Sequence, residues 1–88
     1  MKTTRYFDEQ VLPRRPYIDV AWCAAALANP IRRTTQPDGR IRFWLRIDAT
    51  ADSIPRCLRP RYLRDVTLDD SETIHNAFFD RDFREDAA

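Results

Sequence analysis

The sequence has one glycine, one histidine, one lysine and two cysteines among its 88 residues, and it has no long apolar run. Cys23 and Cys57 lie far apart, and with a single histidine they are too few for a zinc site of the usual kind, so we expect no metal and no cofactor. No segment approaches the roughly eighteen apolar residues of a membrane span, and the N-terminus lacks the apolar segment of a secretory signal. We therefore expect a cytoplasmic protein with no membrane partner.

Charge is plentiful but unevenly distributed, although the formal net charge is only +1. Residues 31–64 contain nine arginines and three aspartates, whereas residues 65–88 contain two arginines and eight acidic residues. Fourteen of the fifteen basic residues are arginine, which forms bidentate contacts with phosphate or carboxylate better than lysine does. The basic middle predicts either an anionic partner or intramolecular pairing with the acidic C-terminal part.

The first thirty residues predict two helices. Residues 4–12 fit a short helix in which Thr4 caps the N-terminus and Pro13 ends or kinks the helix, because proline lacks an amide proton. Asp19 is a good capping residue for a second helix at residues 20–28. The residues of that helix with the spacing of one apolar face are Val20, Cys23, Ala24 and Leu27.

From residue 31 the apolar period changes to two, which is typical of strands. Four strands are expected, at residues 31–36, 40–47, 61–68 and 72–79. The first two should pair as a hairpin, since Pro37 to Gly39 supplies the turn dihedrals. Residues 48–60 have no period and two prolines, and predict a loop. The chain should form a single α+β domain, residues 1–88, with two N-terminal helices packed on one face of a twisted antiparallel sheet of three to four strands.

Alternation assigns the two faces of the second strand. The core face is Ile41, Phe43, Leu45 and Ile47; the other is Arg40, Arg42, Trp44 and Arg46. The fourth strand leaves two alternatives. Its core residues are either Ile74, Asn76 and Phe78, with His75 exposed, or Thr73, His75, Ala77 and Phe79. The tail is expected to fray after Phe83.

Three segments carry a resemblance to a known family: RPYIDVAWCAAALANP, QPDGRIRFW and RYLRDVTLDDSETIHNAFFDRDFR. Over residues 5–84 the chain resembles a bacterial and archaeal family of small domains of unknown function that is grouped with BrnT-like and RelE/ParE-like toxins. The resemblance implies the RelE/ParE-like arrangement of helices on a sheet. Pro13, Asp65 within the third strand and the long loop at 48–60 depart from the family's pattern.

The resemblance also implies an activity, metal-independent RNA cleavage, in which a base takes the 2′-hydroxyl proton and cations stabilise the transition state. The residues that match catalytic positions are His75, Arg42 and Arg64. Those that match nucleic-acid-binding positions are Arg46, Trp44, Tyr62, Arg81 and Arg84. Such a protein would act in a toxin-antitoxin-type system, with RNA and an antitoxin-like protein as its partners.

Each of these residues also has a simpler interpretation. His75 can be a hydrogen-bonded structural residue, and Arg42 and Arg46 can be the solvated side of a strand. Trp44 can cover the sheet beneath the 48–60 loop, and Arg81 can pair with the aspartates on either side of it. The alternative function is therefore a non-catalytic module that binds a protein through its arginine-rich sheet face, either an acidic antitoxin-like protein or a second copy of itself.

Overall fold

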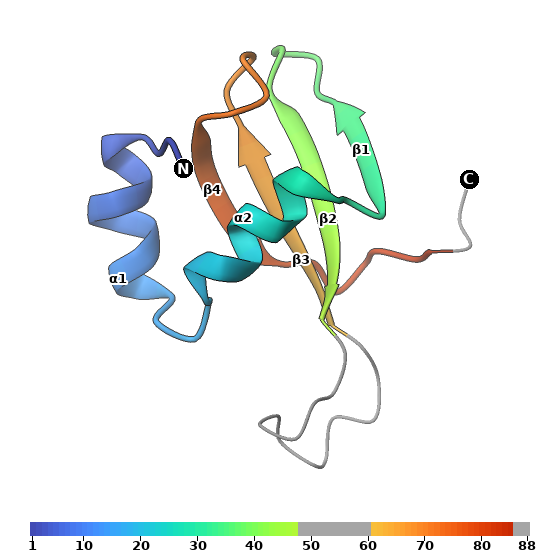
Figure 1. Ribbon diagram of the computed structural model, residues 1–88, viewed down its shortest axis with the longest axis horizontal. Helices are drawn as coiled ribbons and strands as arrows, with labels where there is room; N and C mark the ends of the chain where they lie inside the picture. Colours follow the sequence, from blue (N-terminus) through green and yellow to red (C-terminus); the bar gives the residue numbers. More distant parts are fainter. Residues whose placement is uncertain (48–60, 86–88) are drawn as a thin grey trace.

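The computed structural model describes residues 1–47 and 61–85, which form two helices and a four-stranded sheet (Figure 1). The first helix contains a π-helical segment, η1 (Phe7–Val11), followed directly by α1 (Leu12–Arg14); the second helix is α2 (Val20–Ala28). The strands are β1 (Arg32–Thr35), β2 (Ile41–Ile47), β3 (Arg61–Thr67) and β4 (Ile74–Phe79). They are antiparallel and lie in the order β1-β2-β3-β4, which confirms the α+β class. No helix in these ranges is long and apolar enough to cross a bilayer.

The first helix begins as expected but runs further than expected. Thr4 caps it, because its side-chain oxygen accepts a hydrogen bond of 3.1 Å from the amide of Phe7. Pro13 does not end the helix, which continues to Arg14. The chain widens into a π-turn just before the proline, with the amide of Leu12 bonded to the carbonyl of Phe7. The wider turn moves the carbonyl groups that a proline ring would otherwise meet, so the helix accommodates the residue.

The second helix has the expected start but a different buried face. The Asp19 carboxylate accepts a hydrogen bond of 2.9 Å from the amide two residues further on. Val20 and Ala24 are exposed, so their assignment to the buried face was wrong. The residues of α2 that are buried or pack on the core are Trp22, Cys23, Ala26 and Leu27. The Trp22 ring meets the edge of Phe79 at 6.1 Å between centroids, and burying this large ring fixes the rotation of the helix.

The β1–β2 hairpin is confirmed. Its turn is closed by a 2.7 Å bond from the amide of Gln36 to the carbonyl of Arg40, and Gly39 has a φ of 91°, a region that residues with a Cβ rarely adopt. On β2, Ile41 and Phe43 are buried beneath α2. The helix-covered side of the sheet, which we call the helix face, therefore has the residues expected on this strand.

A β-bulge in β4 changes which side chains face the helices. Asp65 lies opposite Ala77, but two residues further along β3 Thr67 lies opposite Ile74, so β4 contains one extra residue, His75. Ile74 and Ala77 are consequently both fully buried on the helix face. Neither alternative derived from strict alternation holds, because the bulge breaks the two-residue period.

The outer edge of β4 is covered by the N-terminal part of the chain. Ile74 exchanges backbone hydrogen bonds of 2.9 Å with Lys2 and Thr4, which extends the sheet by a short parallel bridge. Further along, the Arg15 guanidinium donates to the carbonyl of Ala77 at 3.2 Å and to the side chain of Asn76 at 3.0 Å. The backbone amide and carbonyl of Ile74 and the carbonyl of Ala77 on this edge are thus bonded within the chain.

Candidate functional site

Arginine and aromatic side chains gather on the outer face of the sheet, the face opposite α2. Trp44 on β2 lies opposite Arg64 on β3, and Arg46 lies opposite Tyr62. We call the following residues the arginine face: Arg32, Arg42, Trp44, Arg46, Tyr62 and Arg64. The structure therefore brings five of the predicted site residues, together with Arg32, onto one sheet face.

Trp44 lies beneath the C-terminal tail and is only 5% exposed. Phe83 stacks on its ring at 5.1 Å between centroids with an angle of 22°. The Trp44 indole and the Arg64 guanidinium both donate to one oxygen of Asp80, at 3.1 and 3.3 Å. Burial alone would raise the pKa of Asp80, but hydrogen bonds from Trp44 and the Asp82 amide, together with Arg64, outweigh burial and lower it. The prediction that Trp44 lies beneath the 48–60 loop concerns residues outside those described.

The tail was expected to fray after Phe83, but it continues across the arginine face with contacts as far as Glu85. The rest of the tail, residues 86–88, lies outside the described residues. The Glu85 carboxylate accepts hydrogen bonds from the Tyr62 hydroxyl at 2.6 Å and from Arg46 at 3.3 Å. Arg32 donates to two backbone carbonyls of the tail, at 3.3 and 3.1 Å. We call residues 80–85 the strap. Its contacts confirm intramolecular pairing between the basic middle and the acidic C-terminal part.

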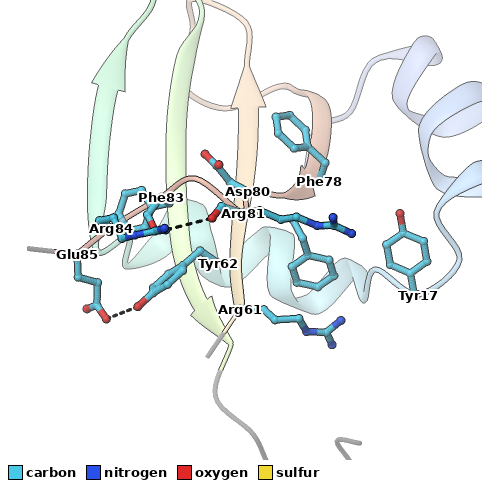
Figure 2. Close-up of a pocket in the computed structure, with 10 residues that line it drawn as sticks. Tyr17, Arg61, Tyr62, Phe78, Asp80, Arg81, Phe83, Arg84 and Glu85 are labelled. Carbon is cyan, nitrogen blue, oxygen red and sulfur yellow. Dashed lines mark hydrogen bonds between the residues drawn. The ribbon is translucent and has the colours of Figure 1, made fainter. Parts of the chain in front are cut away.

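A pocket of about 910 Å³ opens where β3 begins and β4 ends (Figure 2). Its lining residues are Tyr17, Arg61, Tyr62, Phe78, Phe79, Asp80, Arg81, Phe83, Arg84 and Glu85. In Figure 2, Arg61 and Arg81 extend toward Tyr17, whereas Arg84 and Glu85 lie at the other side of the pocket. The pocket thus joins the edge of the helix face to the strap.

The three arginines of the pocket have no carboxylate partner among the described residues. Arg61 lies over the ring of Phe79 at 4.3 Å, and Arg84 donates to the backbone carbonyls of Arg81 and Phe83. The interpretation that Arg81 pairs with the aspartates beside it was wrong, because Asp80 turns toward the arginine face instead. Guanidinium groups beside aromatic rings can hold a planar anionic group by charge and by stacking.

His75 lies at the bulge and contacts the start of the first helix. Its Nδ1 is 3.1 Å from the Thr4 hydroxyl, and its ring stacks on Tyr6 at 4.8 Å between centroids. Partial burial lowers the pKa of His75, and the charge of Arg40 lowers it further. Arg64 lies opposite Phe78, three residues further along β4, or about 10 Å at the rise of a strand. The register therefore separates His75 from Arg64, two of the three residues that match catalytic positions.

Arg42, the third of these, lies on the outer face opposite Val66. Its guanidinium donates to the side-chain oxygen of Gln36 at 3.0 Å. Val66 lies in turn opposite Asn76, so β3 stands between Arg42 and β4. The backbones of strands that are two apart lie about 10 Å from each other, and the catalytic roles of all three residues stay predictions.

A buried ionisable pair lies on the helix face beneath α2. Asp65 is 0% exposed, and neither of its carboxylate oxygens has a hydrogen-bond partner within residues 1–47 and 61–85. Burial raises its pKa to about 8, and the adjacent Cys23 thiol offsets this rise only in part. Burial, followed by the charge of Asp65, raises the pKa of Cys23 to about 12, so the thiol stays protonated and unreactive. Cys57 lies outside the described residues.

Several pocket residues carried no recognisable signal in the sequence. Tyr17 belongs to the connection between the helices, and Arg61 and Phe79 look like ordinary strand termini. The charge segregation did indicate the pairing of the strap.

Among the described residues no three histidine, cysteine, aspartate or glutamate side chains are grouped so that they could hold a metal ion. Comparison of the chain with protein-family models, with curated proteins and with solved structures found no match in any of the three.

Proposed function

We propose that the protein binds single-stranded RNA and that the pocket at the ends of β3 and β4 holds one nucleotide of it. A volume of about 910 Å³ is within the range of small-ligand sites and leaves room for a base and its phosphate. Unstacked bases bind to aromatic rings and guanidinium planes, and phosphates bind to arginine. Both kinds of group line this pocket.

The observation that carries the proposal is that the three pocket arginines have no carboxylate partner among the described residues. On the arginine face, Arg64 is paired with Asp80 and Arg46 with Glu85. Arg61, Arg81 and Arg84 line the pocket without such a carboxylate among the described residues. Asp80 and Glu85 also line the pocket, but they are paired with Arg64 and Arg46. The three pocket arginines therefore attract anions, and a bound phosphate would relieve their mutual repulsion.

Binding without cleavage is the activity that this geometry favours. Cleavage needs a proton-transfer group and a cation that reach the same phosphate. His75 is engaged by Thr4 and Tyr6 at the bulge, away from the pocket residues. Ribonuclease activity, the kinship with BrnT-like and RelE/ParE-like toxins, and an antitoxin-like partner remain proposals that rest on the sequence resemblance.

The test is the binding of a fluorescein-labelled 12-nucleotide oligouridylate, measured by fluorescence anisotropy between 50 and 300 mM salt. We expect affinity to fall steeply with salt, because phosphate contacts release counterions. Arg61→Ala and Arg81→Ala should each weaken binding about tenfold and reduce the salt slope by about one. Arg40→Ala is the matched control: it removes the same charge at the β1–β2 turn, at the other end of the sheet.

His75→Ala should leave the affinity unchanged, since His75 does not line the pocket. Circular dichroism would confirm that each variant is folded. The proposal fails if the oligonucleotide does not bind at 50 mM salt, or if the Arg61 and Arg81 variants bind as tightly as the Arg40 variant does.

A second candidate function is the binding of an acidic protein segment, and the strap is the observation that favours it. The arginine face already accommodates a peptide in which an aromatic residue, Phe83, lies between the acidic residues Asp80 and Glu85. A segment of the same kind from an antitoxin-like protein, or from a second copy of this chain in a homodimer, would find the same partners.

A further inference from the structure

The strap and the pocket form one continuous surface. Phe83, Arg84 and Glu85 line the pocket and also lie on the arginine face. Building on the proposed function, we propose that RNA held in the pocket continues across the arginine face, and that the end of the strap, Phe83 to Glu85, occupies this face until RNA displaces it. Arg81 precedes this part of the strap, so Arg61 and Arg81 continue to line the pocket.

The strap makes the contacts that a nucleotide would make. The Glu85 carboxylate is held by a guanidinium, Arg46, and by the Tyr62 hydroxyl, donors that suit a phosphate oxygen equally well. The Phe83 ring stacks on Trp44 at 5.1 Å, at the place where a base would stack. An anionic group and a planar ring therefore occupy the face in the same alternation as the phosphates and bases of a single strand.

A second arginine adds to the similarity between the strap and a bound nucleotide. The Arg32 guanidinium also lies over the Phe83 ring, 4.8 Å from its centroid, and it donates to two carbonyl oxygens of the strap. Contact with both an aromatic ring and a guanidinium group is a common arrangement for an unpaired base. The arginine face thus offers a ring site and an anion site next to each other.

The strap is attached in a way that permits displacement. Its first residue continues the sheet, because the amide of Asp80 donates to the carbonyl of Tyr62 at 2.8 Å. At its other end, the side chains of Arg46 and Glu85 are 46% and 41% exposed, so water screens their attraction. An RNA strand that already has one nucleotide in the pocket would compete for these contacts at a high effective concentration.

The experiment compares two substitutions that remove the same charge from the strap. Glu85→Gln removes the carboxylate held by Arg46 and Tyr62. Asp82→Asn is the control, because Asp82 is exposed and its side chain has no hydrogen bond or ion pair among the described residues. Affinity is measured by anisotropy for the labelled 12-nucleotide oligouridylate and for a labelled dinucleotide, which reaches only the pocket.

We expect Glu85→Gln to tighten binding of the 12-nucleotide RNA by about fivefold, the upper range for an exposed ion pair. Asp82→Asn should change it less than twofold, and the advantage of Glu85→Gln over Asp82→Asn should be smaller for the dinucleotide.

Three results would overturn the proposal, and they differ in whether RNA binding at the pocket would still hold. Equal gains for Glu85→Gln and Asp82→Asn would show a general charge effect, with RNA binding at the pocket intact. A Glu85→Gln protein that binds a labelled peptide of residues 80–85 more tightly, but RNA no better, would assign the arginine face to peptides. Absence of RNA binding by the wild type and all variants would remove the proposed function as well.

Discussion

Replacing Asp65 with asparagine should stabilise the protein most at alkaline pH. Asp65 lies in the middle of β3, between Phe43 on β2 and Ala77 on β4, and it is fully buried on the helix face. Neither carboxylate oxygen has a hydrogen-bond partner in the described part of the chain, and burial raises the pKa to about 8. The folded protein therefore holds a proton that the unfolded chain gives up at its ordinary pKa of 3.8.

The direction and size of the effect follow from this difference. The stabilisation from the protonated carboxyl is fully present below about pH 4, declines as the pH rises, and is lost above about pH 8. A shift of about 4 pKa units at roughly 1.4 kcal/mol each corresponds to a loss of about 5–6 kcal/mol across this window. Since small domains have roughly 5–15 kcal/mol of stability in total, the loss should be easy to measure.

The assay is urea unfolding, followed by tryptophan fluorescence, from pH 5 to pH 9. The free energy of unfolding of Asp65→Asn minus that of the wild type should rise by several kcal/mol over this range. Asp69→Asn, an exposed neighbour on the following turn, should show no such rise. The lowered pKa of His75 affects both proteins alike, so any contribution from it cancels in the difference. A difference that stays constant from pH 5 to pH 9 would refute the reasoning.

Two further substitutions test local backbone features, with the free energy of unfolding as the measurement. Gly39→Ala should cost about 1 kcal/mol, because the φ of 91° strains any residue with a Cβ; an unchanged stability would contradict this account of the turn. Thr4→Ala should cost about 1 kcal/mol, because it removes the cap on the Phe7 amide. Thr3→Ala, a control that loses only an exposed bond to Asp8, should cost clearly less.

Local chemistry made part of the fold predictable. Turns and helix caps depend on contacts between residues that are only a few positions apart in the sequence. The sequence alone is therefore enough to locate the turn at Pro37 to Gly39 and the capping residues Thr4 and Asp19. The buried face of α2 was harder to predict, because a nine-residue helix rich in alanine has no clear apolar stripe. The packing of the Trp22 ring against Phe79 determines which face of the helix is buried. The bulge at His75 depends on the partner strand and has no signature in β4 itself.

The candidate site, like the fold, was predictable only where the pattern is local in the sequence. The alternation in β2 placed Arg42, Trp44 and Arg46 on one face, and the charge segregation indicated what covers them. The pocket depends on residues that are far apart in the sequence, Tyr17 before α2 and Arg81 after β4. Only the folded chain brings such residues together, so spacing along the sequence could not reveal them.

The covered edge of β4 has a consequence for how copies of this protein behave when concentrated. A sheet can grow from one molecule into the next only through strand edges that still offer backbone donors and acceptors. On one side Lys2, Thr4 and Arg15 already bond to β4, and on the other β1 has only four residues, two of them arginines that repel a like strand. The fold therefore limits edge-to-edge pairing at both ends of its sheet, so concentrated samples should resist β-aggregation even though the net charge is close to zero.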